Sequence, residues 1–237
     1  MKKYKIYFLL FTIFSNTLIS QNLADKKVLV VWGGWDGHKP ELFANHVENW
    51  LIKEKADYKI INGLDAYDNY DELIKYDLII QSVTMDEISK NQEENLVKAV
   101  LNGVGIAGAH GGLVDSFRKN TNYQFMIGGQ FVAHPGGMIK HKVKILDDEL
   151  TIGLSDFDIL SEQYYMHYDP SVKIIAETKF SGEVYPWIKD VIMPIAWKKM
   201  YGKGKVFFIS IGHDPDEFMV YKDGWELLTR GFIWALR

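Results

Sequence analysis

The segment Val104–Val114, VGIAGAHGGLV, constrains the fold more than any other part of the sequence. The apolar residues Val104–Ala107 predict a buried strand, and glycines on both sides of His110 allow a sharp turn and a close approach by a ligand. A turn of the form G-x-nucleophile-x-G places its central side chain at the carboxyl end of a central strand. The plainer alternative is a glycine-rich turn with a solvated histidine.

A second continuous apolar run, Val28–Trp32, is typical of a strand that is covered on both faces. Further strands and helices alternate with these two runs along the first half of the chain. The strands are predicted at Tyr58–Ile61 and Leu78–Gln81, and the helices near Glu41–Lys55, Tyr70–Lys75 and Ser89–Leu101. This alternation implies right-handed crossovers and a mostly parallel sheet.

The alternation stops at residues 117–179. Within them, Lys140–Leu146 alternates polar and apolar residues, as a half-exposed antiparallel strand does. We interpret residues 117–179 as an insertion of short strands and loops that packs over the edge of the sheet and covers a cleft. After a further strand at Val172–Glu177, the main sheet resumes with a hairpin, and a helix closes the chain. The hairpin strands are expected at Pro194–Lys198 and Lys205–Ile211, and the helix at Gly224–Ala235.

Charge and cysteine content exclude several classes of function. The 237 residues carry a formal net charge of −4 and contain no cysteine. A net acidic chain argues against nucleic acid as a partner. The lack of cysteine excludes disulfides, thiolate metal ligands and a catalytic thiol.

Residues 1–20 have the form of a signal peptide. Three lysines precede a short apolar run, Ile6–Phe14, which is too short to span a bilayer comfortably. We expect cleavage between Ser20 and Gln21, no stable membrane span afterwards, and a periplasmic or secreted protein with one domain over residues 26–237. An uncleaved anchor is the alternative.

Three histidines follow predicted strands: His38, His110 and His213. Ligands of open α/β sheets bind beyond the carboxyl ends of the strands, so these imidazoles are candidates for one site. Three imidazole or carboxylate ligands commonly hold a divalent, zinc-like ion and leave one position for water or substrate. The wider set of candidate ligands is His38, His110, His134, Glu162, His167 and His213. None shows a local metal-binding spacing, and acid–base chemistry without a metal remains the alternative.

Several neighbouring residues have two interpretations. Trp35 and Tyr164 could stack on a sugar ring or belong to the core. Asp36 could orient a site histidine or cap a turn, and His134 could contact the site or only its own loop. Two other histidines are expected on the surface: His46 and His141.

Six segments in order resemble the ThuA family, which is named for bacterial trehalose utilisation. They are GGWDGHK, GIAGAHGG, GGQFVAHP, SEQYY, PIAWKKMYGKGKVFFISIGHD and RGFIWAL, and the resemblance covers about Lys27–Arg237. It implies an α/β fold like flavodoxin and the class I glutamine amidotransferases, with a mostly parallel sheet, helices on both faces and an inserted β-rich segment. It also implies a carbohydrate ligand: trehalose, a related disaccharide or a keto-sugar.

The resemblance assigns roles to the histidines. The amidotransferase-like proteins have Cys at the elbow and His in a late loop, where this chain has His110 and His213. Amidotransferase chemistry is therefore excluded. We expect a metal-assisted or histidine-dependent glycoside-processing enzyme, with a non-catalytic sugar-binding or complex-forming module as the alternative; a homo-oligomer is compatible with either. The expected roles are: catalytic, His110, His213 and Glu162; substrate-binding, Trp35, Asp36, His38, His134 and Tyr164; holding one divalent metal ion, His38, His110 and His213.

Overall fold

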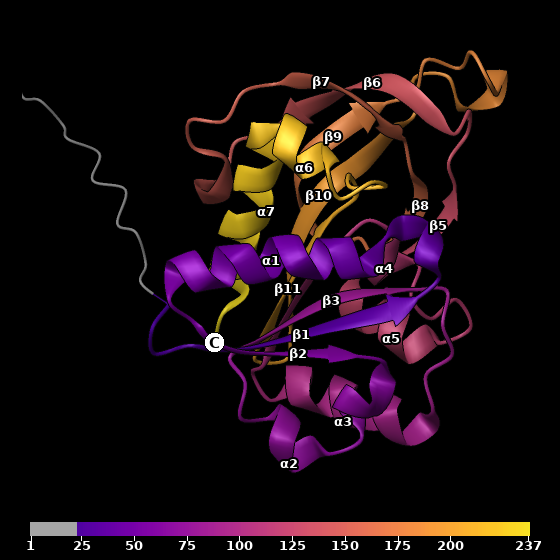
Figure 1. Ribbon diagram of the computed structural model, residues 1–237. Helices are drawn as coiled ribbons and strands as arrows, with labels where there is room; N and C mark the ends of the chain where they lie inside the picture. Colours follow the sequence, from indigo (N-terminus) through magenta and orange to yellow (C-terminus); the bar gives the residue numbers. More distant parts are fainter. Residues whose placement is uncertain (1–22) are drawn as a thin grey trace, which may run out of the picture.

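The computed structural model describes residues 23–237, so the predicted signal peptide lies outside the described residues. Its main feature is a nine-stranded sheet with the order β2-β1-β3-β4-β11-β10-β9-β6-β7 (Figure 1). The first five strands in this order are parallel. They are β2 (Asp57–Asn62), β1 (Lys27–Gly34), β3 (Leu78–Thr84), β4 (Gly105–Ala109) and β11 (Gly204–Ile209). The predicted α/β fold with parallel strands is confirmed.

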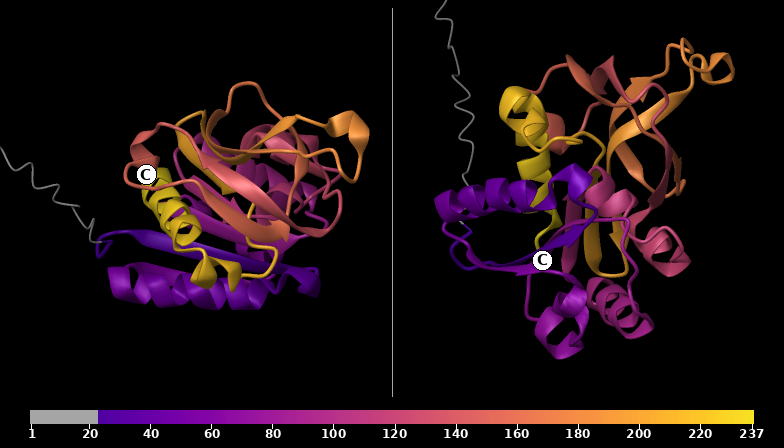
Figure 2. Two further views of the ribbon diagram at one scale, coloured as in Figure 1. Left: turned by 90° about the horizontal axis from the view of Figure 1, so that it is seen from above. Right: turned by 45° about the vertical axis from the view of Figure 1, so that its right-hand side comes forward.

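The other four strands of the sheet are antiparallel. They are β10 (Ile192–Tyr201), β9 (Lys173–Lys179), β6 (Met138–Ile145) and β7 (Phe157–Glu162). The prediction that residues 117–179 pack over the sheet edge is wrong for β6, β7 and β9, because these strands extend the sheet itself. Figure 2 shows this antiparallel part rising away from α2 and α3.

Residues 117–179 also contain structure that the sequence interpretation missed. A short helix, α5 (Thr121–Ile127), begins after Asn120, whose side chain accepts a hydrogen bond from the Tyr123 amide. The strands β5 (Gly129–Ala133) and β8 (Tyr165–Tyr168) form a separate two-stranded antiparallel sheet. This part of the chain therefore supplies a helix, a small sheet and three strands of the large sheet.

Helices cover both faces of the parallel part, as predicted. On one face lie α1 (Pro40–Glu54) and α7 (Lys222–Ala235), and on the other lie α2 (Tyr70–Leu73), α3 (Lys90–Leu101) and α5 (Figures 1 and 2). Each face has its own core: Val47, Trp50 and Phe232 belong to the first, and Leu96 and Met126 to the second. This double covering explains why β1, β3, β4 and β11 are buried along almost their whole length, whereas the edge strand β2 is not.

Local sequence signals account for the helix ends. Pro40 occupies the first turn of α1, where its missing N–H costs nothing. Ser89 and Gln92 form a reciprocal capping box at the start of α3. The short helices are η1 (Asp36–His38), η2 (Leu64–Tyr67), α4 (Gly111–Val114), η3 (Glu149–Thr151), η4 (Pro186–Ile188) and α6 (Glu217–Val220). Within residues 23–237, none of the helices has the length and apolarity needed to cross a bilayer.

The expectation that His141 lies on the surface is wrong. His141 is only 8% exposed, and it shares one face of β6 with the fully buried Val143. The strand has the period of two that the sequence suggested, and its buried face is the one that carries the imidazole. His46 is half-buried in α1 and lies 2.9 Å from the Asp216 carboxylate.

Candidate functional site

His110 occupies the turn between β4 and α4. β4 runs to Ala109, two residues beyond the predicted strand, so that His110 follows it directly. Its backbone has φ 51° and ψ −141°, a conformation that L-residues rarely adopt, and its amide donates to the Ile209 carbonyl at 2.7 Å. The sharp turn predicted at the elbow is therefore present, and it places the imidazole at the carboxyl end of the strand.

The glycines after His110 are needed because other groups lie very close to them. A Cβ added to Gly111 would come within 2.5 Å of the His38 ring, and one on Gly112 within 2.8 Å of the Ser82 backbone. Side chains at these two positions would push α4 away from η1 and β3. The glycines thus allow the elbow and the loop after β1 to approach each other.

The three histidines predicted to follow strands lie together. The ring centroid of His38 is 4.7 Å from that of His110 and 5.2 Å from that of His213, and the His110 and His213 centroids are 5.6 Å apart. They come from the segments after β1, β4 and β11, three parallel strands whose carboxyl ends share one edge of the sheet. The prediction that this edge gathers the imidazoles is confirmed.

Glu162, at the end of β7, completes the group. Its Oε2 lies 3.1 Å from His110 Nε2 and 3.2 Å from His213 Nδ1, and the residue is only 8% exposed. One donor atom from each of His38, His110, Glu162 and His213 lies within 4.8 Å of the others. We call these four residues the histidine–glutamate cluster.

A backbone carbonyl determines how His110 faces this cluster. The His110 Nδ1 atom lies 2.6 Å from the Ser210 carbonyl oxygen, which can only accept a hydrogen bond. Nδ1 therefore carries a proton, and in the neutral ring Nε2 presents its lone pair toward Glu162. The His110 Nε2 lone pair and the Glu162 Oε2 atom are both acceptors and lie 3.1 Å apart, so they need a proton or a cation between them.

The charges of the cluster are strongly coupled. Burial, and after it the nearby His110 and His213 rings, lower the pKa of His38 to about 3. Burial alone would raise the pKa of Glu162, but its contacts with His110 and His213 hold that pKa well below its usual range. The Glu162 carboxylate in turn raises the pKa of His213. At neutral pH the cluster therefore contains an ionised carboxylate and an uncharged His38.

The donor set fits a divalent transition-metal ion. His213 Nδ1 is buried and has no aligned hydrogen-bond partner, although Glu162 Oε2 is 3.2 Å away. Nitrogen and carboxylate donors are typical zinc ligands, and a backbone carbonyl that accepts from the far ring nitrogen is typical of a ligating histidine. Two ligands on one zinc ion are at most about 4 Å apart, so the rings of the half-exposed His38 and His213 would need to turn slightly inward.

Of the other predicted site residues, His134 and Trp35 lie beside the cluster and Asp36 does not. His134 is near the cluster, with Nδ1 3.7 Å from Glu162 Oε1. Trp35 is 48% exposed and packs edge-on against His38 at 4.9 Å. Asp36 is exposed in η1, and its side chain makes no contact with the cluster among the described residues.

Tyr164 and His167 lie outside the accessible site. Tyr164 is 1% exposed and packs beneath His110 with ring centroids 4.1 Å apart, so that it supports the imidazole and has no open face for a sugar. Of its two interpretations, the core one agrees with this burial. His167 is exposed on β8 and is not part of the cluster.

Glu217 is a buried residue beside the cluster that the sequence interpretation missed. It is buried in α6, and its Oε2 accepts from the Gly212 amide at 3.0 Å and from the Ser161 hydroxyl at 2.7 Å. Its Oε1 lies 3.4 Å from the Asp214 amide. Because these groups flank His213 and precede Glu162, Glu217 ties the loop after β11 to the end of β7. Nothing in the local sequence distinguishes this carboxylate from a surface residue.

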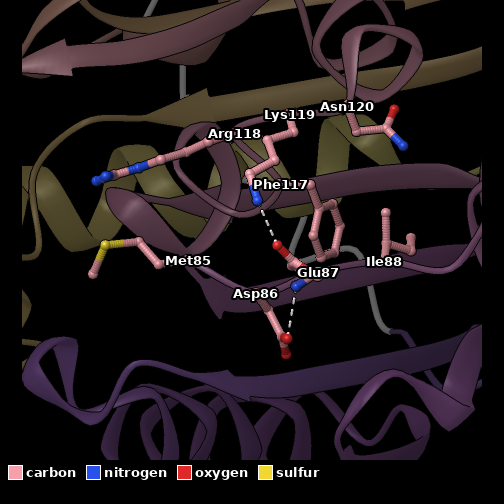
Figure 3. Close-up of a pocket in the computed structure, with 8 residues that line it drawn as sticks. All are labelled: Met85, Asp86, Glu87, Ile88, Phe117, Arg118, Lys119 and Asn120. Carbon is pink, nitrogen blue, oxygen red and sulfur yellow. Dashed lines mark hydrogen bonds and ion pairs between the residues drawn. The ribbon is translucent and has the colours of Figure 1, made fainter.

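A cavity of about 440 Å³ lies at the same edge of the sheet. Its lining comes from the loop after β3 and from the loop between α4 and α5 (Figure 3). The lining residues are Met85, Asp86, Glu87, Ile88, Phe117, Arg118, Lys119 and Asn120. The sequence interpretation did not single out any of them.

The strand order and the strained elbow define an α/β protein of the flavodoxin-like type with a histidine in the turn after β4. A family model described as trehalose utilisation matches residues 27–235. The chain belongs to the ThuA family. Comparison with the curated proteins found no match.

Solved structures share this fold. A ThuA-like protein from Bacteroides uniformis superposes with a TM-score of 0.72 and 18% identity, covering 89% of this chain and 91% of that chain. One from Parabacteroides merdae gives 0.69 and 14%, covering 89% of each chain. A β-galactosidase from Rahnella sp. R3 gives 0.58 and 15%, covering 89% of this chain and 30% of that chain. At these identities the likeness concerns the fold alone.

Proposed function

We propose that this protein is a glycoside-processing enzyme that acts on trehalose, a related disaccharide or a keto-sugar derived from one. In this proposal the histidine–glutamate cluster holds one divalent, zinc-like ion. The observation that carries it is the convergence of three imidazoles and one carboxylate, with donor atoms within 4.8 Å, at the ligand-binding edge of the sheet. The carbohydrate is supported by membership of the trehalose-utilisation family.

The residues of the cluster would have separate roles. The Ser210 carbonyl holds the His110 ring so that Nε2 is free to bind the ion. His38 stays uncharged because its pKa is about 3, so it can also donate a lone pair near neutral pH. When bound, the ion would polarise a sugar oxygen or lower the pKa of a bound water.

Glu162 and the residues beside the cluster would complete the chemistry. Glu162 is ionised, so it can bind the ion or accept a proton from an attacking water, but it is not suited to donate one. Trp35 and His134 are exposed next to the cluster, where a sugar could pack against the indole and donate a hydroxyl proton to the imidazole.

Metal analysis of the purified protein tests the metal proposal. We expect one zinc ion per chain after loading and dialysis, and loss of that ion in His110→Ala. His167→Ala is the matched control, since it removes an exposed histidine outside the cluster. Trehalose and its keto derivatives are then offered to the loaded protein, and conversion is followed by chromatography.

Two other outcomes would lead to different conclusions. Conversion without bound metal, lost in His110→Ala and His213→Ala, would favour acid–base catalysis by these histidines. If no metal binds and sugar binding is unchanged in both variants, the protein is a non-catalytic binding module.

We also propose export to the periplasm or the medium, which rests on the signal-like residues 1–20 alone. Expression of the full chain followed by fractionation and N-terminal sequencing tests it. The expected mature protein begins at Gln21. An uncleaved chain in the cytosol would contradict the proposal.

A further inference from the structure

The cavity of about 440 Å³ next to the cluster has no role in the function proposed above. One of its lining residues, Met85, directly follows a residue that contacts the cluster. Thr84, at the end of β3, has Oγ1 3.2 Å from His38 Nδ1, and Met85 follows it. Because adjacent α-carbons are 3.8 Å apart, the backbone at the Met85 wall of the cavity is next to the residue that contacts His38.

A row of side chains that starts at Arg118, on another wall of the cavity, also connects the cavity to the cluster. The Arg118 guanidinium lies 5.6 Å from the centre of the Phe131 ring. Phe131 stacks on His134 at 5.7 Å and contacts Tyr164 at 4.6 Å, and Tyr164 packs against His110. The cavity and the cluster therefore share a continuous row of side chains as well as the Thr84–Met85 backbone.

Asp115 holds the Arg118 guanidinium by one edge and leaves the Nη1 edge free. Its Nε and Nη2 donate to the two carboxylate oxygens of Asp115, whose side chain is only 4% exposed. Its Nη1 has no partner among residues 23–237. A guanidinium fixed on one side by a buried carboxylate is pre-organised to donate hydrogen bonds on the other side.

Met85 provides an apolar surface at the same end of the cavity. It is 38% exposed and has φ 51°, a conformation stabilised by the hydrogen bond from its amide to the Asp115 carbonyl at 2.8 Å. Figure 3 shows the Met85 and Arg118 side chains extending from that end, away from Ile88 and Asn120. Asp115 thus holds both residues, one through its side chain and one through its backbone.

The charges of the lining indicate an uncharged ligand. Arg118 pairs with Asp115, and Lys119 pairs with Glu87 at 2.7 Å, so neither cation is left to attract an anion. The remaining surface combines apolar side chains with the free Arg118 edge and the Asp86 carboxylate, whose Oδ1 accepts from the Glu87 amide at 2.7 Å and which would repel an anion. A sugar ring matches this combination, because its C–H faces pack on apolar groups while its hydroxyls accept hydrogen bonds. The volume is within the range of small-molecule sites.

We propose that this cavity is a second sugar subsite, which binds the ring of a disaccharide that is not held at the histidine–glutamate cluster. Arg118 donates to hydroxyls of that ring, and Met85 packs against its face. This inference rests on the proposed carbohydrate function, and it limits the preferred substrate to two linked rings.

Calorimetric titration of the zinc-loaded protein with trehalose and with glucose tests the subsite. In Arg118→Met, which keeps an unbranched side chain over Phe131, we expect at least tenfold weaker trehalose binding, while glucose and zinc binding stay unchanged. Lys90→Met, which removes a cation from an exposed pair with Glu94 outside the cavity, is the control and should change neither sugar.

A second variant protects the test against misfolding, since Arg118→Met leaves Asp115 buried without its partner. Met85→Asn removes the apolar face, and asparagine tolerates a positive φ. We expect about fivefold weaker trehalose binding and an unchanged Tm. A loss confined to trehalose in either folded variant supports the subsite. Unchanged trehalose binding in both, or equal losses for trehalose and glucose, overturns it. A wild-type protein that binds zinc but neither sugar would instead contradict the proposed function.

Discussion

The parallel and antiparallel parts of the sheet contribute different groups to the same site. The segments after the parallel strands β1, β4 and β11 supply His38, His110 and His213, all nitrogen donors. The antiparallel part supplies Glu162 at the end of β7, and His134 comes from the loop after β5. The first part therefore provides three imidazole donors, and the second provides the ionised carboxylate that faces two of them.

The strand directions explain how two such different parts meet. Four antiparallel pairings separate β7 from β11, and four reversals return the chain to its original direction. The carboxyl end of β7 therefore points to the same edge as the parallel strands. Contact between Glu162 and His213 then requires the sheet to curl, which the right-handed twist of strands allows.

Removing a donor from the parallel part should have the largest effect. We expect His213→Ala to weaken zinc binding by more than about 100-fold, because a nitrogen ligand is lost outright. Competition with a chromogenic chelator measures it. Unchanged affinity would mean that the parallel part is not the ligand platform.

Removing the charge from the antiparallel part should have a smaller but still large effect. In Glu162→Gln we expect about 10- to 100-fold weaker zinc binding, because the amide keeps an oxygen near the ion but loses the negative charge of the carboxylate ligand. In the metal-free protein the pKa of His213 should fall, because the Glu162 carboxylate is what raises it. An NMR titration of the imidazole proton measures this shift. A His213 pKa that does not move would show that the two parts are not electrostatically coupled.

Weakening the contacts by which Glu217 connects the two parts should have a smaller effect on zinc binding than the two changes above. Glu217→Gln keeps the size of the side chain but replaces one of its acceptor oxygens with an amide. We expect about tenfold weaker zinc binding and a loss of about 1–2 kcal/mol in unfolding free energy. The exposed Glu94→Gln is the matched control. A loss of stability without a loss of zinc affinity would show that Glu217 stabilises α6 but does not position the loop after β11.

The smallest effect concerns His141 and pH. Burial lowers its pKa, so below the unfolded-state value of about 6.5 the unfolded chain binds more protons than the folded one. Stability should therefore fall as the pH drops from 7 to 5, by less than about 1.4 kcal/mol per pH unit. His141→Leu should reduce this dependence, whereas the exposed His167→Leu should not. Urea unfolding at a series of pH values measures it, and parallel curves for wild type and His141→Leu would contradict the assignment.

The parallel part could be predicted almost completely because its signals are local. Val28–Trp32 and Val104–Ala107 are apolar without interruption, since helices cover both faces of the sheet. Once these strands are parallel, the residues after them must share one edge, and this edge brings His38, His110 and His213 together. The observed elbow at His110 also follows from its flanking glycines.

The antiparallel part could be predicted only as a pattern. The alternation in Lys140–Leu146 indicated a strand, but not which face would be buried or which neighbour it would pair with. His141 was therefore placed on the wrong side, and β6, β7 and β9 were placed over the sheet edge when they extend the sheet. Register and pairing depend on contacts between distant residues, such as Lys144 with Glu177 across β6 and β9.

The sequence by itself determined the α/β class, the sharp turn at His110 and the edge of the sheet at which three imidazoles meet. These follow from hydrophobic runs, glycine and chain direction, which act over a few residues. Only the tertiary structure decided that Glu162 faces His110 and His213, that Glu217 ties the loop after β11 to the end of β7 and that Arg118 lies at the end of a nearby cavity. Each of these contacts joins residues from separate elements, and their positions depend on how far the sheet curls.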